Sequence, residues 1–188
     1  MNDILKQIPN VLTMIRLILV VPFLLCLFDQ QFTYALYIFV IAGVTDALDG
    51  GLARGFHWQS NFGKVLDPMA DKLLVTASFI GLAVLGLLPW WLVGLVFARD
   101  LTISLGVLAW CALMPQKPAL NPTMVSKVNT WMQLMLVMVH LCEQAFVVSI
   151  PNLSLIFLVL TTLSTAVSFI DYVWTWGRIA CQQTRLCK

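Results

Sequence analysis

Long apolar stretches separated by short polar segments dominate the chain. Six of the stretches reach about 20 residues, the length of helix that crosses the hydrocarbon core of a bilayer. Because Pro, Asn, Gln and Gly mark the breaks between them, each stretch predicts one helix. The expected spans are approximately 9–28, 33–54, 67–87, 90–114, 123–148 and 153–176. The pattern predicts an all-α integral membrane protein, a six-transmembrane-helix bundle that forms a single domain over residues 1–188.

The composition supports a membrane protein and excludes several other classes. The chain is 60% hydrophobic and only 11% charged, whereas soluble domains carry about 25% charged residues. The net charge of +2 and the lack of a basic stripe argue against nucleic-acid binding. The five cysteines show no Cys-x-x-Cys spacing, so neither a zinc site nor a disulfide framework is indicated.

The Lys and Arg residues alternate along the predicted helix ends. They occur at both termini and beside the segments 55–66 and 116–122, whereas the turns near 29–32, 87–90 and 149–152 carry none. The cations at these places are Lys6, Arg54, Lys64, Lys117, Lys127, Arg178, Arg185 and Lys188. Positive charge is retained on the cytoplasmic side. We therefore expect a multi-pass protein of the bacterial inner membrane or an equivalent membrane, with both termini and the 55–66 link in the cytoplasm.

Four aspartates lie in two close pairs around the 55–66 link. Asp46 and Asp49 are three residues apart, and Asp67 and Asp71 are four apart, so each pair shares one helix face. The short link allows the two helices to pack with the pairs facing one cavity. Carboxylates so close together repel, and a low dielectric makes each one costly without a cationic partner. The pattern predicts a site built to hold positive charge.

Small residues and the ligand type indicate what that charge is. Gly50 and Ala53 share the face of Asp46, and Gly63 lies one turn before Asp67, which leaves space beside the carboxylates. Ligands that are all oxygen suit Mg²⁺, Mn²⁺ or Ca²⁺. Neither histidine lies at ligand spacing, which disfavours zinc. Four carboxylates match two ions, and two-metal sites commonly bind the oxygens of a phosphoryl displacement.

Two other interpretations of the aspartates remain. In the first, they pair with Arg54, Lys64 and Lys72 in a solvated interfacial loop. In the second, the protein is an ion or proton transporter, which would place acids near mid-membrane on several helices. Here the acids gather at the predicted cytoplasmic ends of two helices and alternate with Gly and Ala, which favours a metal site.

Residues 46–71 read Asp-x2-Asp-Gly-x2-Ala-Arg-x8-Gly-x3-Asp-x3-Asp. This sequence closely resembles the signature of the CDP-alcohol phosphatidyltransferases, a divalent-metal-dependent family, and a match this long is specific. All eight signature positions are present: Asp46, Asp49, Gly50, Ala53, Arg54, Gly63, Asp67 and Asp71. The resemblance extends over nearly the whole chain, including the count of six helices.

The resemblance implies a reaction and a role for each signature residue. An acceptor hydroxyl attacks the β-phosphorus of a CDP-linked lipid, and CMP leaves. Asp46, Asp49 and Asp67 would hold metal, with Mg²⁺ or Mn²⁺ as the implied cofactor. Asp71 would help bind the second ion and act as general base. The implied nucleotide-binding set is Asp46, Asp49, Gly50, Ala53, Arg54 and Gly63. A homodimer is also implied.

Three further stretches bear on the acceptor. Residues 8–16 resemble the opening of family members that use glycerol-type acceptors, which implies Asn10, Thr13 and Arg16 as acceptor-binding residues. Because a buried cation in a membrane is costly, Arg99 and Lys127 should face a polar cavity and bind acceptor phosphate. The simpler alternatives are an ion pair of Arg99 with Asp100 or another acid and interfacial snorkelling of Lys127.

The charge of the acceptor pocket separates two candidate acceptors. The bacterial phosphatidylglycerophosphate synthases of this family usually carry cations where this chain has Val107 and Asn129. A less basic pocket suits the monoanionic diester of phosphatidylglycerol better than the nearly dianionic monoester of glycerol 3-phosphate. Residues 97–100 and 122–130 also resemble the cardiolipin synthases of the family. The expected reaction is therefore CDP-diacylglycerol plus phosphatidylglycerol giving cardiolipin and CMP, with glycerol 3-phosphate as the alternative acceptor.

Overall fold

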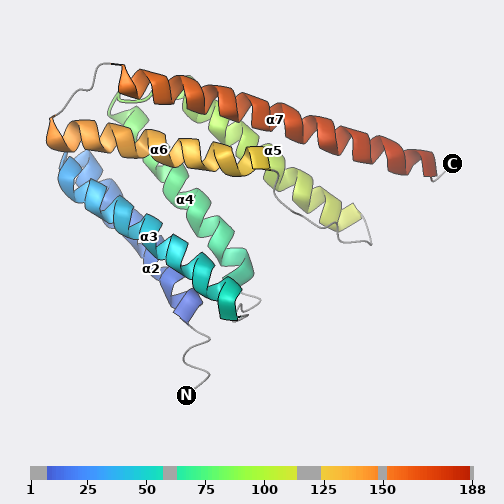
Figure 1. Ribbon diagram of the computed structural model, residues 1–188, viewed down its shortest axis with the longest axis horizontal. Helices are drawn as coiled ribbons and strands as arrows, with labels where there is room; N and C mark the ends of the chain where they lie inside the picture. Colours follow the sequence, from blue (N-terminus) through green and yellow to red (C-terminus); the bar gives the residue numbers. More distant parts are fainter. Residues whose placement is uncertain (1–7, 57–62, 114–123, 148–151, 187–188) are drawn as a thin grey trace. The chain divides into compact units, whose positions relative to one another are not determined.

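The structure, a computed structural model, is all-helical over the residues that it describes. These are residues 8–56, 63–113, 124–147 and 152–186, with side chains described in 14–45, 72–106, 124–147 and 152–174. The helices are α2 (Ile8–Phe28), α3 (Phe32–Phe56), α4 (Gly63–Val84), α5 (Trp90–Leu113), α6 (Met124–Phe146) and α7 (Leu153–Leu186) (Figure 1). The all-α prediction is confirmed, and α7 continues past its expected end near residue 176.

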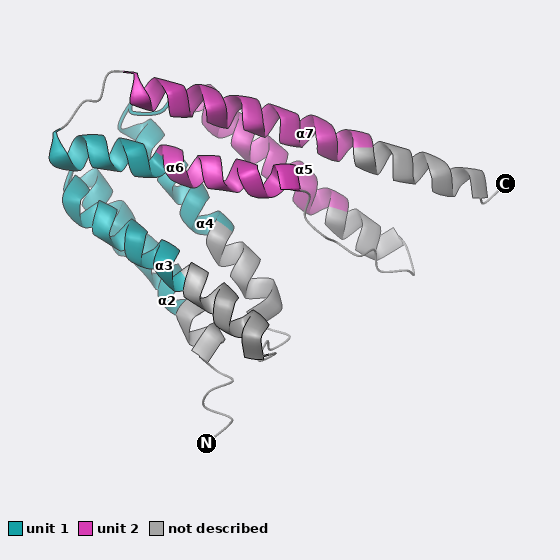
Figure 2. Ribbon diagram, viewed as in Figure 1, with its two compact units in different colours: residues 1–88, 137–151 teal, residues 89–136, 152–188 magenta. Residues whose placement is uncertain are grey.

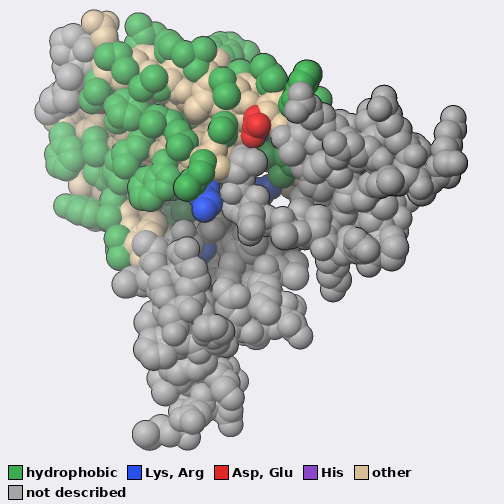
Figure 3. Space-filling model, turned by 45° about the vertical axis from the view of Figure 1, so that its right-hand side comes forward, with side chains coloured by type: hydrophobic (Ala, Val, Ile, Leu, Met, Phe, Trp, Pro, Cys, Tyr) green, Lys and Arg blue, Asp and Glu red, His purple; other side chains and the backbone are tan. Residues whose placement is uncertain are grey.

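The described helices expose a largely apolar exterior. Within α7, Leu153–Trp174 has 22 residues and a mean hydropathy of 2.2, so this segment is long and apolar enough to cross a membrane. Shorter apolar helical segments are Met14–Phe28, Phe32–Thr45 and Lys72–Val84. Every helix exposes large apolar side chains, for example Ile18, Ile41, Val84, Leu105, Trp131 and Ile170. Figure 3 shows such side chains over the described part of one face. An exterior of this kind suits an apolar surrounding better than water.

The chain forms two compact units (Figure 2). Unit 1 comprises Met1–Leu88 and Val137–Pro151, and unit 2 comprises Pro89–Leu136 and Asn152–Lys188. Helices α2, α3 and α4 therefore belong to unit 1, and α5 and α7 to unit 2, while α6 contributes its first part to unit 2 and its second part to unit 1. The single domain expected over the chain stays a prediction.

Apolar packing holds unit 1 together. Helix α2 packs against both α3 and α4. Its buried residues Val20, Phe23 and Leu27 are spaced by three and four, so they form one stripe along the helix. The ring of Phe23 lies 6.0 Å from that of Phe39 in α3. On α4, Gly81 allows close approach, because a methyl group there would collide with the side chain of Leu27.

Two helices of unit 1 end in the same hydrogen-bonded turn. At the end of α2, the N–H of Gln30 donates to the carbonyl of Leu27 at 3.1 Å, and the N–H of Gln31 donates to that of Cys26 at 2.8 Å. This is a Schellman motif, which requires a left-handed residue after the helix. The same bonds recur after α4 around Gly86. The φ angles are 57° at Gln30 and 75° at Gly86, and only the glycine adopts this region without strain.

Unit 2 is built differently, because its core contains many polar side chains. Helix α5 packs against α7. The α5 positions Leu92, Val96 and Arg99 are buried at spacings of four and three, so the apolar stripe of this helix continues into a charged side chain. On α7, Thr161, Thr165 and Ser168 are buried at the same spacings. Hydroxyl side chains thus occupy the buried face of α7. The helices of unit 2 thus present polar groups to one another.

Candidate functional site

The eight signature residues lie on two helices of unit 1. The first five, Asp46 to Arg54, occupy the C-terminal part of α3 (Phe32–Phe56), and the last three, Gly63 to Asp71, occupy the first turns of α4 (Gly63–Val84). Both parts lie within helices that are otherwise apolar. Residues that are three or four apart in the sequence are therefore about one helical turn apart. The side chains at 46–56 and 63–71 lie outside the described set. The predicted four-carboxylate cluster stays a prediction.

The signature residues have the donor chemistry expected of a site for a divalent metal ion. A helix turns about 100° per residue. Asp46 and Asp49 therefore share a face of α3, and Asp67 and Asp71 share a face of α4. Four carboxylates provide the hard oxygen donors that Mg²⁺ and Mn²⁺ prefer. The donor chemistry and the backbone thus agree with the metal-binding roles expected for these residues.

The expected acceptor residues of α2 begin at its first turn. Asn10 and Thr13 lie in α2, and their side chains are outside the described set. Arg16 follows at helical spacing and is only 1% exposed. Because Arg16 continues the stripe of Val20 and Phe23, this cation points into unit 1 and not to its exterior. Burial of a guanidinium is costly, so the position indicates a specific polar role.

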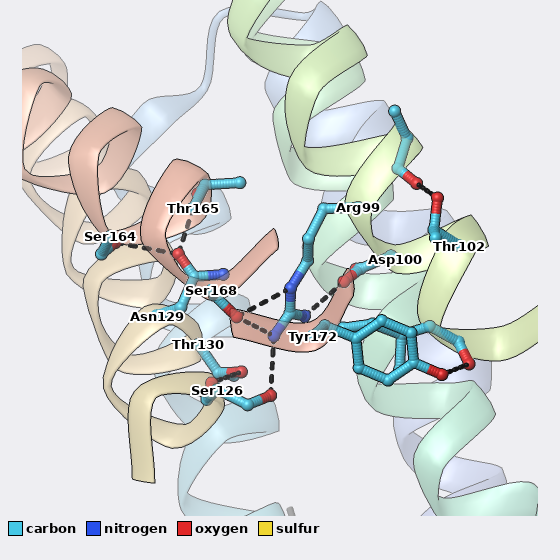
Figure 4. Close-up of polar contacts among 12 residues, drawn as sticks. Arg99, Asp100, Thr102, Ser126, Asn129, Thr130, Ser164, Thr165, Ser168 and Tyr172 are labelled. Carbon is cyan, nitrogen blue, oxygen red and sulfur yellow. Dashed lines mark hydrogen bonds and ion pairs between the residues drawn. The ribbon is translucent and has the colours of Figure 1, made fainter. Parts of the chain in front are cut away.

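Arg99 is the centre of a polar cluster that joins three helices of unit 2 (Figure 4). Its side chain is buried and forms an ion pair with Asp100, with Nη1 2.6 Å from Oδ1. Nη2 donates to the hydroxyl of Ser126 on α6 at 2.6 Å. Ser168 on α7 accepts from both Nε, at 3.2 Å, and Nη2, at 2.8 Å. The structure thus contains an Arg99–Asp100 ion pair, and two serine contacts that the sequence did not suggest accompany it. The acceptor-binding role of Arg99 stays a prediction.

Asn129 extends the polar contacts one turn further along α6. Its side chain is fully buried, and its Oδ1 lies 2.8 Å from the hydroxyls of both Ser164 and Thr165 on α7. Thr161 adds a further contact, because its hydroxyl donates to the backbone carbonyl of Met132 at 3.1 Å. A neutral amide at position 129 thus engages α7 directly. These bonds fix the register of α6 against α7 within unit 2.

Tyr172 ties the next turn of α7 to α5. Its hydroxyl donates to the carbonyl of Ile103 at 3.1 Å. The contact depends on Gly106, because a methyl group on that residue would collide with the tyrosine hydroxyl. A glycine without a side chain lets the two helices approach closely at this point. The polar face of α7 therefore runs from Thr161 through Ser168 to Tyr172.

Lys127 lies beside the Arg99 cluster in sequence but is exposed on α6. Consecutive residues of a helix point about 100° apart. The neighbouring Ser126 is the residue that contacts Arg99. Arg99 and Lys127 were expected to share one pocket. In the structure Arg99 is buried, whereas Lys127 is exposed. The acceptor-binding role of Lys127 stays a prediction.

The sequence contained a signal for the α7 contacts that the sequence reasoning missed. Thr161, Thr165, Ser168 and Tyr172 follow one another at spacings of four, three and four, which places all four hydroxyls on one helix face. In an otherwise apolar helix, such a face predicts hydrogen bonding to neighbouring helices. Their partners lie far away in sequence. Arg99 precedes Ser168 by 69 residues.

The family comparison agrees with the signature on α3 and α4. The model of the CDP-alcohol phosphatidyltransferase family matches residues 6–174 of the chain. The chain belongs to this family. The match includes both signature helices and extends through the Arg99 cluster to the hydroxyl face of α7. It therefore covers both units and all the residues proposed for the site.

Relatives of this family member are named for two different reactions. Human cardiolipin synthase (CMP-forming) is 33% identical over 190 residues, which cover 93% of this chain and 63% of that protein. A probable cardiolipin synthase of Drosophila melanogaster is 39% identical over 146 residues, 69% of this chain and 45% of that protein. The CDP-diacylglycerol–glycerol-3-phosphate 3-phosphatidyltransferase of Bacillus subtilis is 33% identical over 146 residues, 70% of this chain and 74% of that protein. The chain thus spans about half to two thirds of the cardiolipin synthases that it matches.

Proposed function

We propose that this family member transfers a phosphatidyl group from CDP-diacylglycerol to phosphatidylglycerol, forming cardiolipin and releasing CMP. The observation that carries the proposal is the complete signature, in order and at helical spacing on α3 and α4. The printed names of the human and Drosophila relatives support the same reaction. The signature supports CDP-diacylglycerol as the substrate that donates the phosphatidyl group. The choice of acceptor substrate is argued from Arg99, Lys127 and Asn129 of unit 2.

The chemistry is a displacement at the β-phosphorus. The hydroxyl oxygen of the acceptor forms a bond to this phosphorus, and the bond from phosphorus to the bridging oxygen of the pyrophosphate breaks. The electron pair of that bond leaves with CMP, and Asp71 takes the hydroxyl proton. Asp46, Asp49, Asp67 and Asp71 would hold two divalent ions, which neutralise pyrophosphate charge when bound. Arg54 would lie beside the nucleotide phosphates, and Gly50, Ala53 and Gly63 would admit the cytidine.

Unit 2 supports phosphatidylglycerol as the acceptor. The ion pair with Asp100 offsets the charge of Arg99, and the amide of Asn129 is neutral. The charge available to an acceptor is therefore small, with the exposed Lys127 as an additional cation. A monoanionic phosphodiester needs less positive charge than the nearly dianionic monoester of glycerol 3-phosphate. Asn10, Thr13 and Arg16 complete the proposed acceptor-binding set.

Glycerol 3-phosphate is the second candidate acceptor. The Bacillus subtilis relative bears the name of that reaction and is matched over 74% of its length. A probable phosphatidylglycerophosphate synthase of Mycobacterium tuberculosis is 40% identical over 106 residues, 53% of this chain and 51% of that protein. Both acceptors use the same donor, the same signature and the same leaving group. An enzyme for one acceptor would differ from an enzyme for the other only in the residues that contact the acceptor.

The proposal includes a six-span arrangement in the membrane. The shortest helix, α2, has 21 residues, and at about 1.5 Å per residue such a helix spans a hydrocarbon core of about 30 Å. The exposed apolar side chains on all six helices support lipid contact. The distribution of Lys and Arg supports cytoplasmic termini and a cytoplasmic active site. We also propose a homodimer, on the strength of the family alone.

The experiment that tests the function supplies labelled CDP-diacylglycerol to the purified protein with Mg²⁺ or Mn²⁺. One reaction contains phosphatidylglycerol and another contains glycerol 3-phosphate, and the lipid product and CMP are identified. We expect cardiolipin and CMP from the first reaction. Product from glycerol 3-phosphate alone would replace the acceptor and keep the chemistry.

Two controls test the reaction class in the same assay. A strong chelator of divalent ions should abolish CMP release, and full turnover in its presence would exclude the metal-dependent mechanism. Failure to release CMP with either acceptor would refute the transferase. Metal- or proton-coupled flux into liposomes without CMP release would instead support the transporter interpretation.

A further inference from the structure

The hydrogen bonds of Arg99 occupy most of its guanidinium group. A guanidinium has five N–H groups in a fixed plane. One N–H of Nη1 is directed to Asp100, both of Nη2 to Ser126 and Ser168, and that of Nε to Ser168. Four of the five donors are therefore used. Among the described residues, the second N–H of Nη1 has no partner.

Ser168 differs from the other two partners because it accepts two bonds from Arg99. It is 2% exposed, and its hydroxyl oxygen accepts from Nε and Nη2, so both lone pairs are engaged. Two bonds to adjacent nitrogens fix the plane of the guanidinium and not only its position. Asp100 is the next residue on the same helix, and Ser126 accepts one bond from Arg99. The plane of the Arg99 guanidinium is therefore tied to α7, in addition to the single contacts with Asp100 and Ser126.

We propose that Ser168 is a positioning residue for the acceptor step. By fixing the plane of Arg99, it directs the remaining N–H of Nη1 toward an oxygen of the acceptor phosphate. The inference rests on the proposed function, in which Arg99 contacts the acceptor. Ser168 itself touches neither substrate. Recognition by Arg99 is then a single charge-assisted hydrogen bond, and its direction is set from another helix.

Loss of the Ser168 hydroxyl has a defined consequence. Without it, Nε and one N–H of Nη2 lose their acceptor, and the guanidinium turns toward the carboxylate of Asp100. A carboxylate accepts two parallel bonds from a guanidinium readily. The N–H of Nη1 that bonded the phosphate of the acceptor substrate is then drawn into the ion pair with Asp100. Binding of the acceptor weakens, while binding of CDP-diacylglycerol, which the signature helices carry, is unchanged.

The test compares Ser168→Ala with a matched variant of the same helix. Thr161→Val also removes a buried hydroxyl that bonds α6, with little change of shape, but its partner is the backbone of Met132 and not Arg99. The measurements are KM for phosphatidylglycerol at saturating CDP-diacylglycerol, KM for CDP-diacylglycerol, and thermal unfolding. Ser168→Ala should raise the acceptor KM about tenfold. Thr161→Val should leave it within about twofold of the wild type.

A third variant and the wild type separate positioning from structure. Ser168→Thr retains the hydroxyl and should restore most of the acceptor affinity. Equal increases of acceptor KM in Ser168→Ala and Thr161→Val, or an unchanged KM in Ser168→Ala at the activity of the wild type, would overturn the positioning role. A wild-type protein that releases no CMP with either acceptor would instead refute the proposed function. If Ser168→Ala fails to fold, Ser168→Cys with a wild-type melting temperature replaces it, because a thiol sulfur is a weaker acceptor than a hydroxyl. A raised acceptor KM in that variant supports the role, and a wild-type KM opposes it.

Discussion

The two units are held together by different kinds of contact. In unit 1, apolar side chains such as Phe23 and Phe39 pack between helices, and the buried Ser78 donates to the carbonyl of Leu74 on its own helix at 2.8 Å. In unit 2, side chains of Arg99 and Asn129 bond across α5, α6 and α7. Lipid tails are as apolar as leucine, so shape and hydrogen bonds decide how membrane helices associate. The contacts described for α2 with α3 and α4 are of the first kind, and those that join α5, α6 and α7 in unit 2 are of the second kind.

This difference has a functional reason within the proposed reaction. In unit 1, the proposed chemistry belongs to the signature residues of α3 and α4, and the apolar packing of these helices against α2 needs only to be rigid. The acceptor residues of unit 2 must hold a buried cation such as Arg99 at a set angle, which apolar contacts do not specify. The directional hydrogen bonds that Arg99 donates to Ser126 and Ser168 provide that angle. The comparison therefore predicts different responses of the two units to substitution.

The largest expected effect is a loss of turnover in unit 1 without a loss of stability. Asp71→Asn keeps the shape of the side chain but removes the general base, so turnover should fall by about 10²–10⁴-fold. Binding of CDP-diacylglycerol and the melting temperature should change little. CMP release and lipid binding by the purified variant measure both effects. Asp29→Asn, in the exposed turn after α2, is the control and should retain activity. Turnover of Asp71→Asn equal to that of the wild type would remove it as the base.

The next effect tests the closest approach in unit 2. Gly106→Ala places a methyl group against the hydroxyl of Tyr172, which donates to Ile103. Overpacking of this kind costs about 1–3 kcal/mol, and the melting temperature in detergent should fall. Gly94→Ala on the same helix meets nothing within 4 Å and should be neutral or slightly stabilising. Equal melting temperatures for the two variants would contradict the close contact between α5 and α7.

A smaller effect compares the two units directly. Thr165→Val removes one of the two hydroxyls on the Asn129 amide oxygen and should cost about 0.5–1.5 kcal/mol. Ser78→Ala removes only a bond within one helix of unit 1 and should cost less than about 0.5 kcal/mol. Unfolding of both variants under the same denaturing conditions gives the difference. If Ser78→Ala were the more destabilising, the distinction between the units would be wrong.

The smallest effect concerns the paired helix ends of unit 1. Gln30 adopts the left-handed region that Gly86 adopts in the equivalent turn. Gln30→Gly should therefore relieve strain and stabilise the protein by about 0.5 kcal/mol, after the entropic cost of glycine is subtracted. Gly86→Ala should destabilise it by about 1 kcal/mol. Melting temperatures that move in the same direction for both variants would exclude this account.

The helix positions were largely predictable from the sequence, because hydropathy reports on each segment by itself. The expected spans 9–28 and 90–114 correspond closely to α2 (Ile8–Phe28) and α5 (Trp90–Leu113). The prediction for the last helix was too short, since α7 continues to Leu186. Hydropathy marks where the apolar stretch ends, whereas a helix continues for as long as its backbone hydrogen bonds do. The polar residues after Trp176 do not interrupt those bonds.

The sequence by itself determined the six helices and the order of the signature, because helical spacing is a local property of the chain. It also indicated that Arg99 needs a polar partner. Only the tertiary structure decided which partner. Asp100 was visible as a neighbour, but the bond to Ser168 joins residues 69 positions apart and depends on how α5 and α7 pack. The donor signature is therefore readable from spacing alone, whereas the orientation of Arg99 is a property of the folded unit.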